Sequence, residues 1–149
     1  MVSFSQKKEL VANKFRRVND MKIEHIGLYV HDMEKAKDFF VKYFKADASE
    51  LYHNFNSGFS SYFLTFDGSS RLEIMQRPTM EDPPKGTYRT GYHHIAIEVG
   101  DRKDVDDLTK RIQEDGYKIV SGARMTGDGY YESTILDEEG NSVEIFAKP

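Results

Sequence analysis

Short stretches in which every second residue is apolar recur along the chain, and they occur in two matching sets. Residues 24–30 read Glu-His-Ile-Gly-Leu-Tyr-Val, and residues 93–99 read His-His-Ile-Ala-Ile-Glu-Val. Residues 71–75 read Arg-Leu-Glu-Ile-Met, and residues 142–146 read Ser-Val-Glu-Ile-Phe. This period of two predicts β-strands. The nearly constant spacing of the copies predicts two successive repeats of one small unit.

Each repeat also contains one helix-like segment. The first repeat is expected to place a helix at 33–44, with Asp32 as its N-cap, and the second a helix at 103–115, with Gly116 as its C-cap. The predicted strands are 22–30, 50–54, 60–66 and 71–76 in the first repeat, and 92–99, 117–121, 130–136 and 142–147 in the second.

The resulting prediction is an α+β protein made of two tandem βαβββ modules, 22–77 and 92–148, packed through their sheets into a single domain at 21–149. Residues 78–91 contain prolines and glycines without a periodic apolar pattern, so they are expected to be the linker. Residues 1–20 form an N-terminal extension, with an amphipathic helix expected at 5–18. That helix is expected to pack on the domain or on a second subunit, and a regulatory arm is the alternative.

The amino-acid composition limits the possible metal ligands, partners and location. The 149 residues include no cysteine, so any metal ligands must be nitrogen or oxygen atoms, and a reducing cytoplasm is the expected location. The net charge of −4 indicates no class of partner by itself, and the lack of a sustained basic stripe argues against nucleic acid as a partner. The N-terminus has no long apolar run, which argues against a signal peptide or a membrane anchor.

The repeats place two histidines and two glutamates in equivalent positions. By strand alternation, His25 and His94 point away from the apolar, helix-covered face, and so do Glu73 and Glu144. Two imidazoles and two carboxylates on the inner faces could surround one divalent cation, with His25, Glu73, His94 and Glu144 as its ligands. The alternative is a solvated sheet face carrying ordinary polar residues. The remaining histidines, which lack such partners in the repeat, are expected to be surface or packing residues: His31, His53 and His93.

These motifs resemble the vicinal oxygen chelate superfamily, and within it the glyoxalase I group. The resemblance covers residues from about 22 to 148 and implies two modules that form a curved mixed sheet. Glyoxalase I enzymes have a His, Glu, His, Glu ligand set, whereas extradiol dioxygenases and fosfomycin-modifying thiol transferases use two His and one Glu. The segments that carry the resemblance are His25-Ile26-Gly27-Leu28, Leu72-Glu73-Ile74, His94-Ile95-Ala96-Ile97 and the turn and strand at 137–144.

The resemblance implies a metal-dependent lyase or isomerase acting on a thiol hemithioacetal of methylglyoxal or a related 2-oxoaldehyde, and hence methylglyoxal detoxification. By resemblance, Glu144 is the catalytic base and Glu73 its partner. Nickel or cobalt is the expected metal, with zinc as an alternative, and a homodimer is the expected assembly. Candidate substrate-binding residues are Tyr29, Met75, Arg77 and Phe146. Tyr29 and Arg77 occupy the positions where bacterial glyoxalase I enzymes have an Arg and an Asn that bind glutathione. The resemblance therefore does not identify the thiol of the substrate.

Two other functions remain as alternatives at this point. One is a different metal-dependent reaction of the superfamily, either ring cleavage or the addition of a thiol to an epoxide. The other is a metal-free protein that binds a small molecule and confers resistance to it. The sequence also leaves open whether the four ligands come from one chain or are shared across a dimer.

Overall fold

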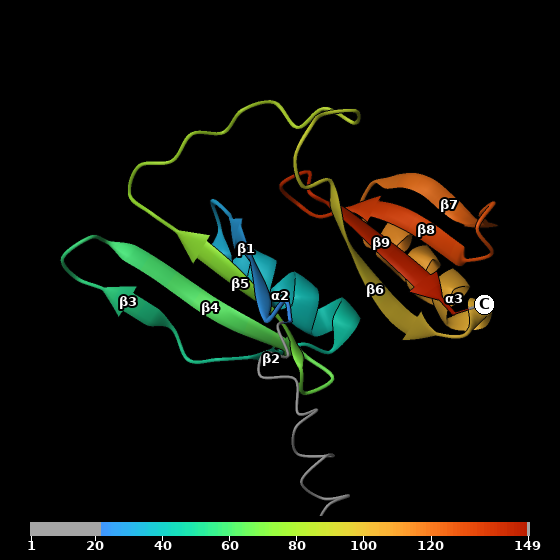
Figure 1. Ribbon diagram of the computed structural model, residues 1–149, viewed down its shortest axis with the longest axis horizontal. Helices are drawn as coiled ribbons and strands as arrows, with labels where there is room; N and C mark the ends of the chain where they lie inside the picture. Colours follow the sequence, from blue (N-terminus) through green and yellow to red (C-terminus); the bar gives the residue numbers. More distant parts are fainter. Residues whose placement is uncertain (1–21, 149) are drawn as a thin grey trace, which may run out of the picture.

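The computed structural model describes residues 22–148 and contains two modules, each of which begins with a strand and a helix and continues with further strands (Figure 1). It confirms an α+β fold built from βαβββ-type modules, while the helix expected at 5–18 lies outside the described residues. The first module contains β1 (His25–Tyr29), α2 (Met33–Phe44), β2 (Asp47–Ala48), β3 (Tyr52–Asn54), β4 (Phe59–Phe66) and β5 (Ser70–Gln76). The second contains β6 (His94–Gly100), α3 (Arg102–Glu114), β7 (Ile119–Met125), β8 (Tyr131–Leu136) and β9 (Ser142–Ala147).

Each module forms its own sheet. The first sheet has the order β1-β5-β4-β2, with β3 also paired to β4, and the second has the order β6-β9-β8-β7. In both sheets the first strand is an edge strand that runs parallel to the last strand of its module. This topology places the histidine-bearing strand directly beside the glutamate-bearing strand. The strand predicted at 50–54 is shorter in the structure, where β2 and β3 are separated by residues 49–51.

Local signals at the helix ends explain where the helices begin and end. The Asp32 side chain accepts a hydrogen bond from the backbone N–H of Lys35 at 3.0 Å, as expected of an N-cap. Helix α3 ends at Glu114, one residue earlier than predicted. Its C-cap is Asp115, and Gly116 follows with a φ of 94°, a conformation that favours glycine. Neither helix within residues 22–148 has the length and apolarity needed to cross a bilayer.

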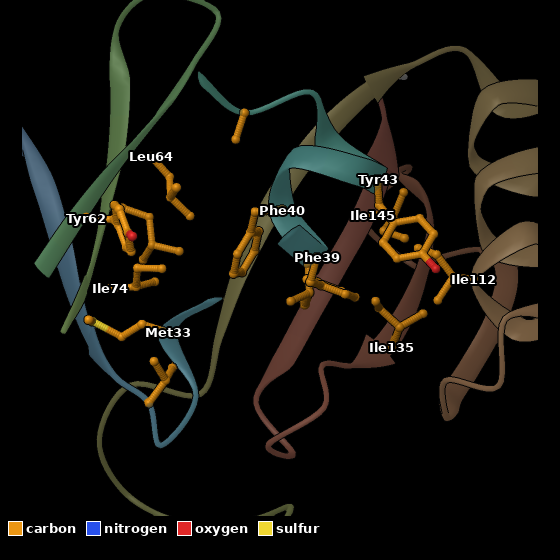
Figure 2. Close-up of a cluster of buried hydrophobic side chains, with 14 of the residues drawn as sticks. Met33, Phe39, Phe40, Tyr43, Tyr62, Leu64, Ile74, Ile112, Ile135 and Ile145 are labelled. Carbon is orange, nitrogen blue, oxygen red and sulfur yellow. The ribbon is translucent and has the colours of Figure 1, made fainter. Parts of the chain in front are cut away.

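Helix α2 packs against the first sheet on one side and the second module on the other (Figure 2). Phe40 is 1% exposed and lies toward the side of Leu64 and Ile74, which are fully buried. On the other side, the rings of Phe39 and Tyr43 lie 5.1 and 5.6 Å from the ring of Tyr117. The prediction that the modules pack through their sheets is therefore wrong. They meet through α2, because this helix carries aromatic side chains on both of its sides.

Polar contacts reinforce this arrangement. The Glu139 carboxylate, in the β8–β9 turn, accepts hydrogen bonds from the backbone N–H groups of His31 and Asp32, just ahead of α2. From the linker, the Lys85 ammonium donates to the Glu139 carbonyl at 2.7 Å. At the other end of α2, the Lys42 ammonium donates to Asp115 at 2.9 Å. The two modules are thus held in a defined orientation from both ends of one helix.

Candidate metal centre

The structure brings the four predicted ligands together as two separate pairs. In the first module, the Nε2 atom of His25 lies 3.7 Å from a carboxylate oxygen of Glu73. In the second module, the Nε2 atom of His94 lies 3.5 Å from a carboxylate oxygen of Glu144. The side chains of these glutamates are 17% and 19% exposed, and those of the histidines about twice that. Each pair therefore lies partly sheltered on the face of its sheet that neither α2 nor α3 covers.

The geometry of each pair suits a shared divalent cation. An imidazole nitrogen and a carboxylate oxygen each bind zinc at about 2.0–2.2 Å, so two ligands of one ion lie about 3–4 Å apart. Both measured separations fall in this range. Two neutral imidazoles and two carboxylates would also balance the charge of a divalent ion. The residues present therefore fit a metal with nitrogen and oxygen ligands.

The two pairs do not meet within one chain. Among residues 22–148, no group of three or more histidine, aspartate or glutamate side chains is close enough to hold one ion. A cavity of about 460 Å³ lies between the modules, lined by Ile26 and Leu28 on one side and by His94 and Ile95 on the other. The free edges of β1 and β6 thus lie on opposite sides of this cavity. A single chain in this arrangement offers two half-sites rather than one complete set of ligands.

His25 has partners on both ring nitrogens. Its Nδ1 atom lies 2.6 Å from the Glu24 carboxylate, which also accepts a hydrogen bond at 2.5 Å from the Nε of Arg71. The Arg71 guanidinium and the neighbouring His25 ring hold the pKa of Glu24 at about 2, well below its usual value. The ring of Phe63 packs edge-on against His25 at 5.3 Å, and Arg71 lies over the same ring at 4.1 Å. The imidazole is therefore fixed from three directions.

His94 has a different neighbour at the equivalent atom. Its Nδ1 lies 3.0 Å from the Nδ1 of His93, which sequence reasoning treated as a surface or packing residue. His93 is exposed, but it contacts the predicted ligand directly. The sequence did contain a signal for this contact, because Glu24 and His93 each immediately precede a predicted ligand histidine.

A third carboxylate, missed by the sequence reasoning, lies beside Glu144. Glu132 is on β8, opposite Phe146 of β9, and therefore shares the open face with Glu144. Its side chain is 15% exposed, and its carboxylate lies 3.7 Å from the Arg124 guanidinium. Burial and the adjacent Glu144 raise the pKa of Glu132 above its usual value. Strand alternation in the segment 130–136 could have revealed this residue.

The predicted substrate-binding residues continue along the same open faces. The Nε of Arg77 donates a hydrogen bond to the Tyr29 hydroxyl at 2.8 Å, and its guanidinium lies 5.4 Å from the centre of the Phe59 ring. Met75 lies over Gly27, where an added Cβ would come within 2.7 Å of the Met75 methyl group. In the second module, Phe146 packs against Tyr130 with ring centres 5.6 Å apart. The structure thus brings Tyr29 and Arg77 together, with Met75 on the strand pair beside them.

In the second module, the positions equivalent to Tyr29 and Arg77 are held by Glu98 and Lys148. There, Lys148 lies 3.1 Å from a carboxylate oxygen of Glu98, the residue equivalent to Tyr29. The cation of the second module is therefore neutralised by a carboxylate, whereas Arg77 pairs with a neutral phenol.

Comparison with known proteins identifies the family. The sequence model of the Glyoxalase/Bleomycin resistance protein/Dioxygenase superfamily matches residues 22–145, and the chain belongs to this superfamily. The chain is also similar to the uncharacterized protein YqjT of Bacillus subtilis, with 26% identity over 128 residues that cover 84% of this chain and 98% of YqjT.

Solved structures of superfamily proteins share the fold. Glyoxalase I from Zea mays superposes with a TM-score of 0.71 and 20% identity over 85% of this chain, which spans 44% of the maize chain. The trypanothione-dependent glyoxalase I of Leishmania major superposes with a TM-score of 0.68 and 18% identity. The match covers 86% of this chain and 87% of the Leishmania chain. The fosfomycin resistance protein FosX from Listeria monocytogenes superposes with a TM-score of 0.65 and 21% identity. The match covers 88% of this chain and 94% of the FosX chain. At these identities the likeness concerns the fold and leaves the reaction open.

Proposed function

We propose that this protein is a metal-dependent lyase of the glyoxalase I type, which isomerises the hemithioacetal formed by a thiol and a 2-oxoaldehyde such as methylglyoxal. The observation that carries the proposal is the duplicated His–Glu pair, His25 with Glu73 and His94 with Glu144, at nearly equal separations of 3.7 and 3.5 Å. Superfamily members that add thiols to epoxides or cleave aromatic rings resemble this chain in only three of its four ligands. The complete set of four therefore favours the isomerase.

We further propose that two chains build each site. Within residues 22–148, strands β1 and β6 each have one edge without a partner strand, and such edges readily pair with another chain. In a twofold dimer, the first module of one chain can lie beside the second module of its partner, and symmetry then creates two equivalent sites. Each site would hold His25 and Glu73 of one subunit and the equivalents of His94 and Glu144 from the other.

A divalent metal held by these four residues would act as a Lewis acid that polarises the substrate carbonyl. The chain's own residues supply the proton transfer. Glu144, positioned next to the reacting carbon, removes the proton from the carbon that bears the sulfur and the hydroxyl group. The same proton is then returned to the neighbouring carbon, while the hydroxyl proton is transferred to the oxygen of that neighbouring carbon, which gives a 2-hydroxy thioester. The reaction is an isomerisation, so it needs no external oxidant or reductant. Glu73 remains the partner carboxylate on the opposite side of the substrate.

Tyr29 and Arg77 would select the thiol. Because Arg77 pairs with a phenol instead of a carboxylate, its positive charge is available to an anionic group of the substrate. Phe59 gives this end of the face an aromatic wall, and Met75 and Phe146 add apolar surface closer to the ligands. These contacts favour a thiol that carries a carboxylate at some distance from its sulfur.

The direct test is metal analysis followed by enzyme assays. Protein purified without chelator or metal-affinity resin is analysed for nickel, cobalt, zinc, iron and manganese, and then assayed with methylglyoxal and several low-molecular-weight thiols. We expect a bound metal, with nickel or cobalt giving the highest turnover, and metal-dependent formation of the thioester product. Metal binding without turnover of any hemithioacetal would refute the isomerase while leaving the site intact.

Two further outcomes would favour the alternative functions. Metal-dependent consumption of fosfomycin, without turnover of hemithioacetals, would favour epoxide opening, which is tested because FosX shares this fold. If no metal binds and none raises the melting temperature, the protein is better described as a metal-free binding protein.

A further inference from the structure

The residues that precede the two ligand histidines are different, although the rest of each half-site is repeated. Glu24 occupies the position before His25, and His93 occupies the position before His94. Both contact the Nδ1 atom of the histidine that follows, at 2.6 and 3.0 Å respectively. Each ligand histidine therefore has its Nδ1 occupied and its Nε2 directed toward a glutamate.

This contact decides which nitrogen of His25 carries the proton. A carboxylate only accepts hydrogen bonds, so the neutral His25 ring must carry its hydrogen on Nδ1 to bond with Glu24. The lone pair of Nε2 then points toward Glu73, where a cation would lie. Isolated neutral histidine prefers to carry the hydrogen on Nε2, so the contact with Glu24 works against the intrinsic preference and toward the metal-binding form.

The same reasoning applies to His94, with a neutral partner. Two neutral imidazoles joined through their Nδ1 atoms need one donor and one acceptor. If His94 is to keep its Nε2 lone pair free, its Nδ1–H must donate, and His93 must accept while carrying its own hydrogen on Nε2. His93 can fill this role, but it brings no negative charge to the pair.

The two contacts also differ in how firmly they are held. Glu24 is anchored by Arg71, which lies on β5 directly opposite His25 and packs over Phe63. A hydrogen bond to a carboxylate is stronger than one between neutral groups, and it makes the opposite nitrogen of the ring a better donor to a metal. His93, by contrast, is exposed. Within residues 22–148, its side chain forms a hydrogen bond with the His94 ring and no other.

We propose that Glu24 is a positioning residue that selects the Nδ1–H form of His25, that His93 is one that allows the same form at His94 without imposing it, and that the carboxylate makes the first-module pair the tighter of the two half-sites. This inference rests on the proposed metal function for its second part. Its first part concerns the hydrogen positions of the metal-free protein and stands independently. Neither residue would touch the cation or the substrate.

Nuclear magnetic resonance tests the first part without any metal. The ¹⁵N shifts of the ring nitrogens of apo-protein, treated with chelator, distinguish the two neutral forms at a pH where the rings are uncharged. We expect the Nδ1–H form at His25 and His94, and a shift toward the Nε2–H form at His25 in Glu24→Ala. Predominance of the Nε2–H form at His25 in the unaltered protein would overturn the proposal.

Titration of apo-protein with Co²⁺ tests the second part, by calorimetry and by the visible spectrum of the bound ion. Loss of such an outer partner typically weakens metal binding about 10–100-fold. We expect Glu24→Ala to fall within this range and His93→Ala to show a smaller loss. His93→Asn should recover most of the affinity, because the Asn oxygen can accept the hydrogen bond that the His93 ring accepts. Glu50→Gln, an exposed carboxylate in the β2–β3 connection, is the matched control.

The outcomes separate this inference from the proposed function. If the unaltered protein binds no Co²⁺, the metal function fails and the ranking of the half-sites fails with it, while the NMR result still decides the hydrogen positions. If Co²⁺ binds but Glu24→Ala and His93→Ala both bind it like the unaltered protein, the positioning role is refuted and the metal function stands. An equal loss in the two variants would refute the ranking of the half-sites.

Discussion

Glu139 and His31 join the two modules, because the carboxylate of Glu139 accepts hydrogen bonds from the backbone N–H of His31 at 2.8 and 2.9 Å. The contact spans 108 residues of sequence and lies at the N-terminal end of α2, where a negative charge is stabilised by the helix dipole. It fixes the orientation of the modules and so keeps the two half-sites of one chain apart.

Removing this carboxylate should weaken the attachment of the second module. We expect Glu139→Ala to lower the free energy of unfolding by about 1.5–3 kcal/mol, the usual effect of losing hydrogen bonds to a charged group. Urea unfolding followed by circular dichroism measures the change. Glu81→Ala, in the exposed part of the linker, is the control and should be close to neutral. Equal stability of the two variants would contradict a role for Glu139 in holding the modules.

Glu144 should matter more to turnover than to metal retention. Replacing it by Gln keeps an oxygen ligand but removes the base, and a positioned base contributes about 100- to 10,000-fold to a rate. We therefore expect Glu144→Gln to retain much of the metal and to lose turnover on this scale, as measured by kcat and by metal analysis of the same sample. Glu98→Gln, on the open face of the same sheet, is the control. Parallel losses of metal and activity in Glu144→Gln would make Glu144 a structural ligand only.

Glu132 should destabilise the metal-free protein once it is ionised. Its pKa is raised above the ordinary value of 4.5, so the folded protein holds this proton more tightly than the unfolded chain does. The contribution of protonated Glu132 to the free energy of unfolding is then lost as the pH rises from about 4.5 through the folded-state pKa. We expect Glu132→Gln to have the higher melting temperature at neutral pH in the presence of chelator, with the difference shrinking toward pH 4. A difference that does not depend on pH would show that the charge of Glu132 is not its cause.

Much of each module was predictable because its determinants are local. Alternation placed His25 and Glu73 on one face, and Asp32 marked the start of the first helix, as the structure confirms. The parallel pairing of β1 with β5 then brings the histidine and the glutamate together within each module. These features depend on periods of two and 3.6 residues, which can be seen in the sequence.

The relation between the modules was not predictable in the same way. It depends on Phe39 and Tyr43 reaching Tyr117, and on Glu139 reaching the start of α2, contacts between residues far apart in the chain. Periodicity can identify apolar positions along α2, but it cannot show that the aromatic residues there contact two different neighbours. The partners of the predicted ligand histidines, Glu24 and His93, were missed for a related reason, since a polar residue at the end of a strand usually faces solvent.

The central claim, one metal site built from two chains, is tested most directly by mixing two inactive variants. One variant carries His25→Ala and Glu73→Ala, the other carries His94→Ala and Glu144→Ala, and neither alone can assemble four ligands at any site. After the subunits are exchanged, each mixed dimer should contain one complete site, so bound metal should rise from near zero toward one ion per mixed dimer. No gain of metal on mixing, although mixed dimers form, would contradict a site shared between chains.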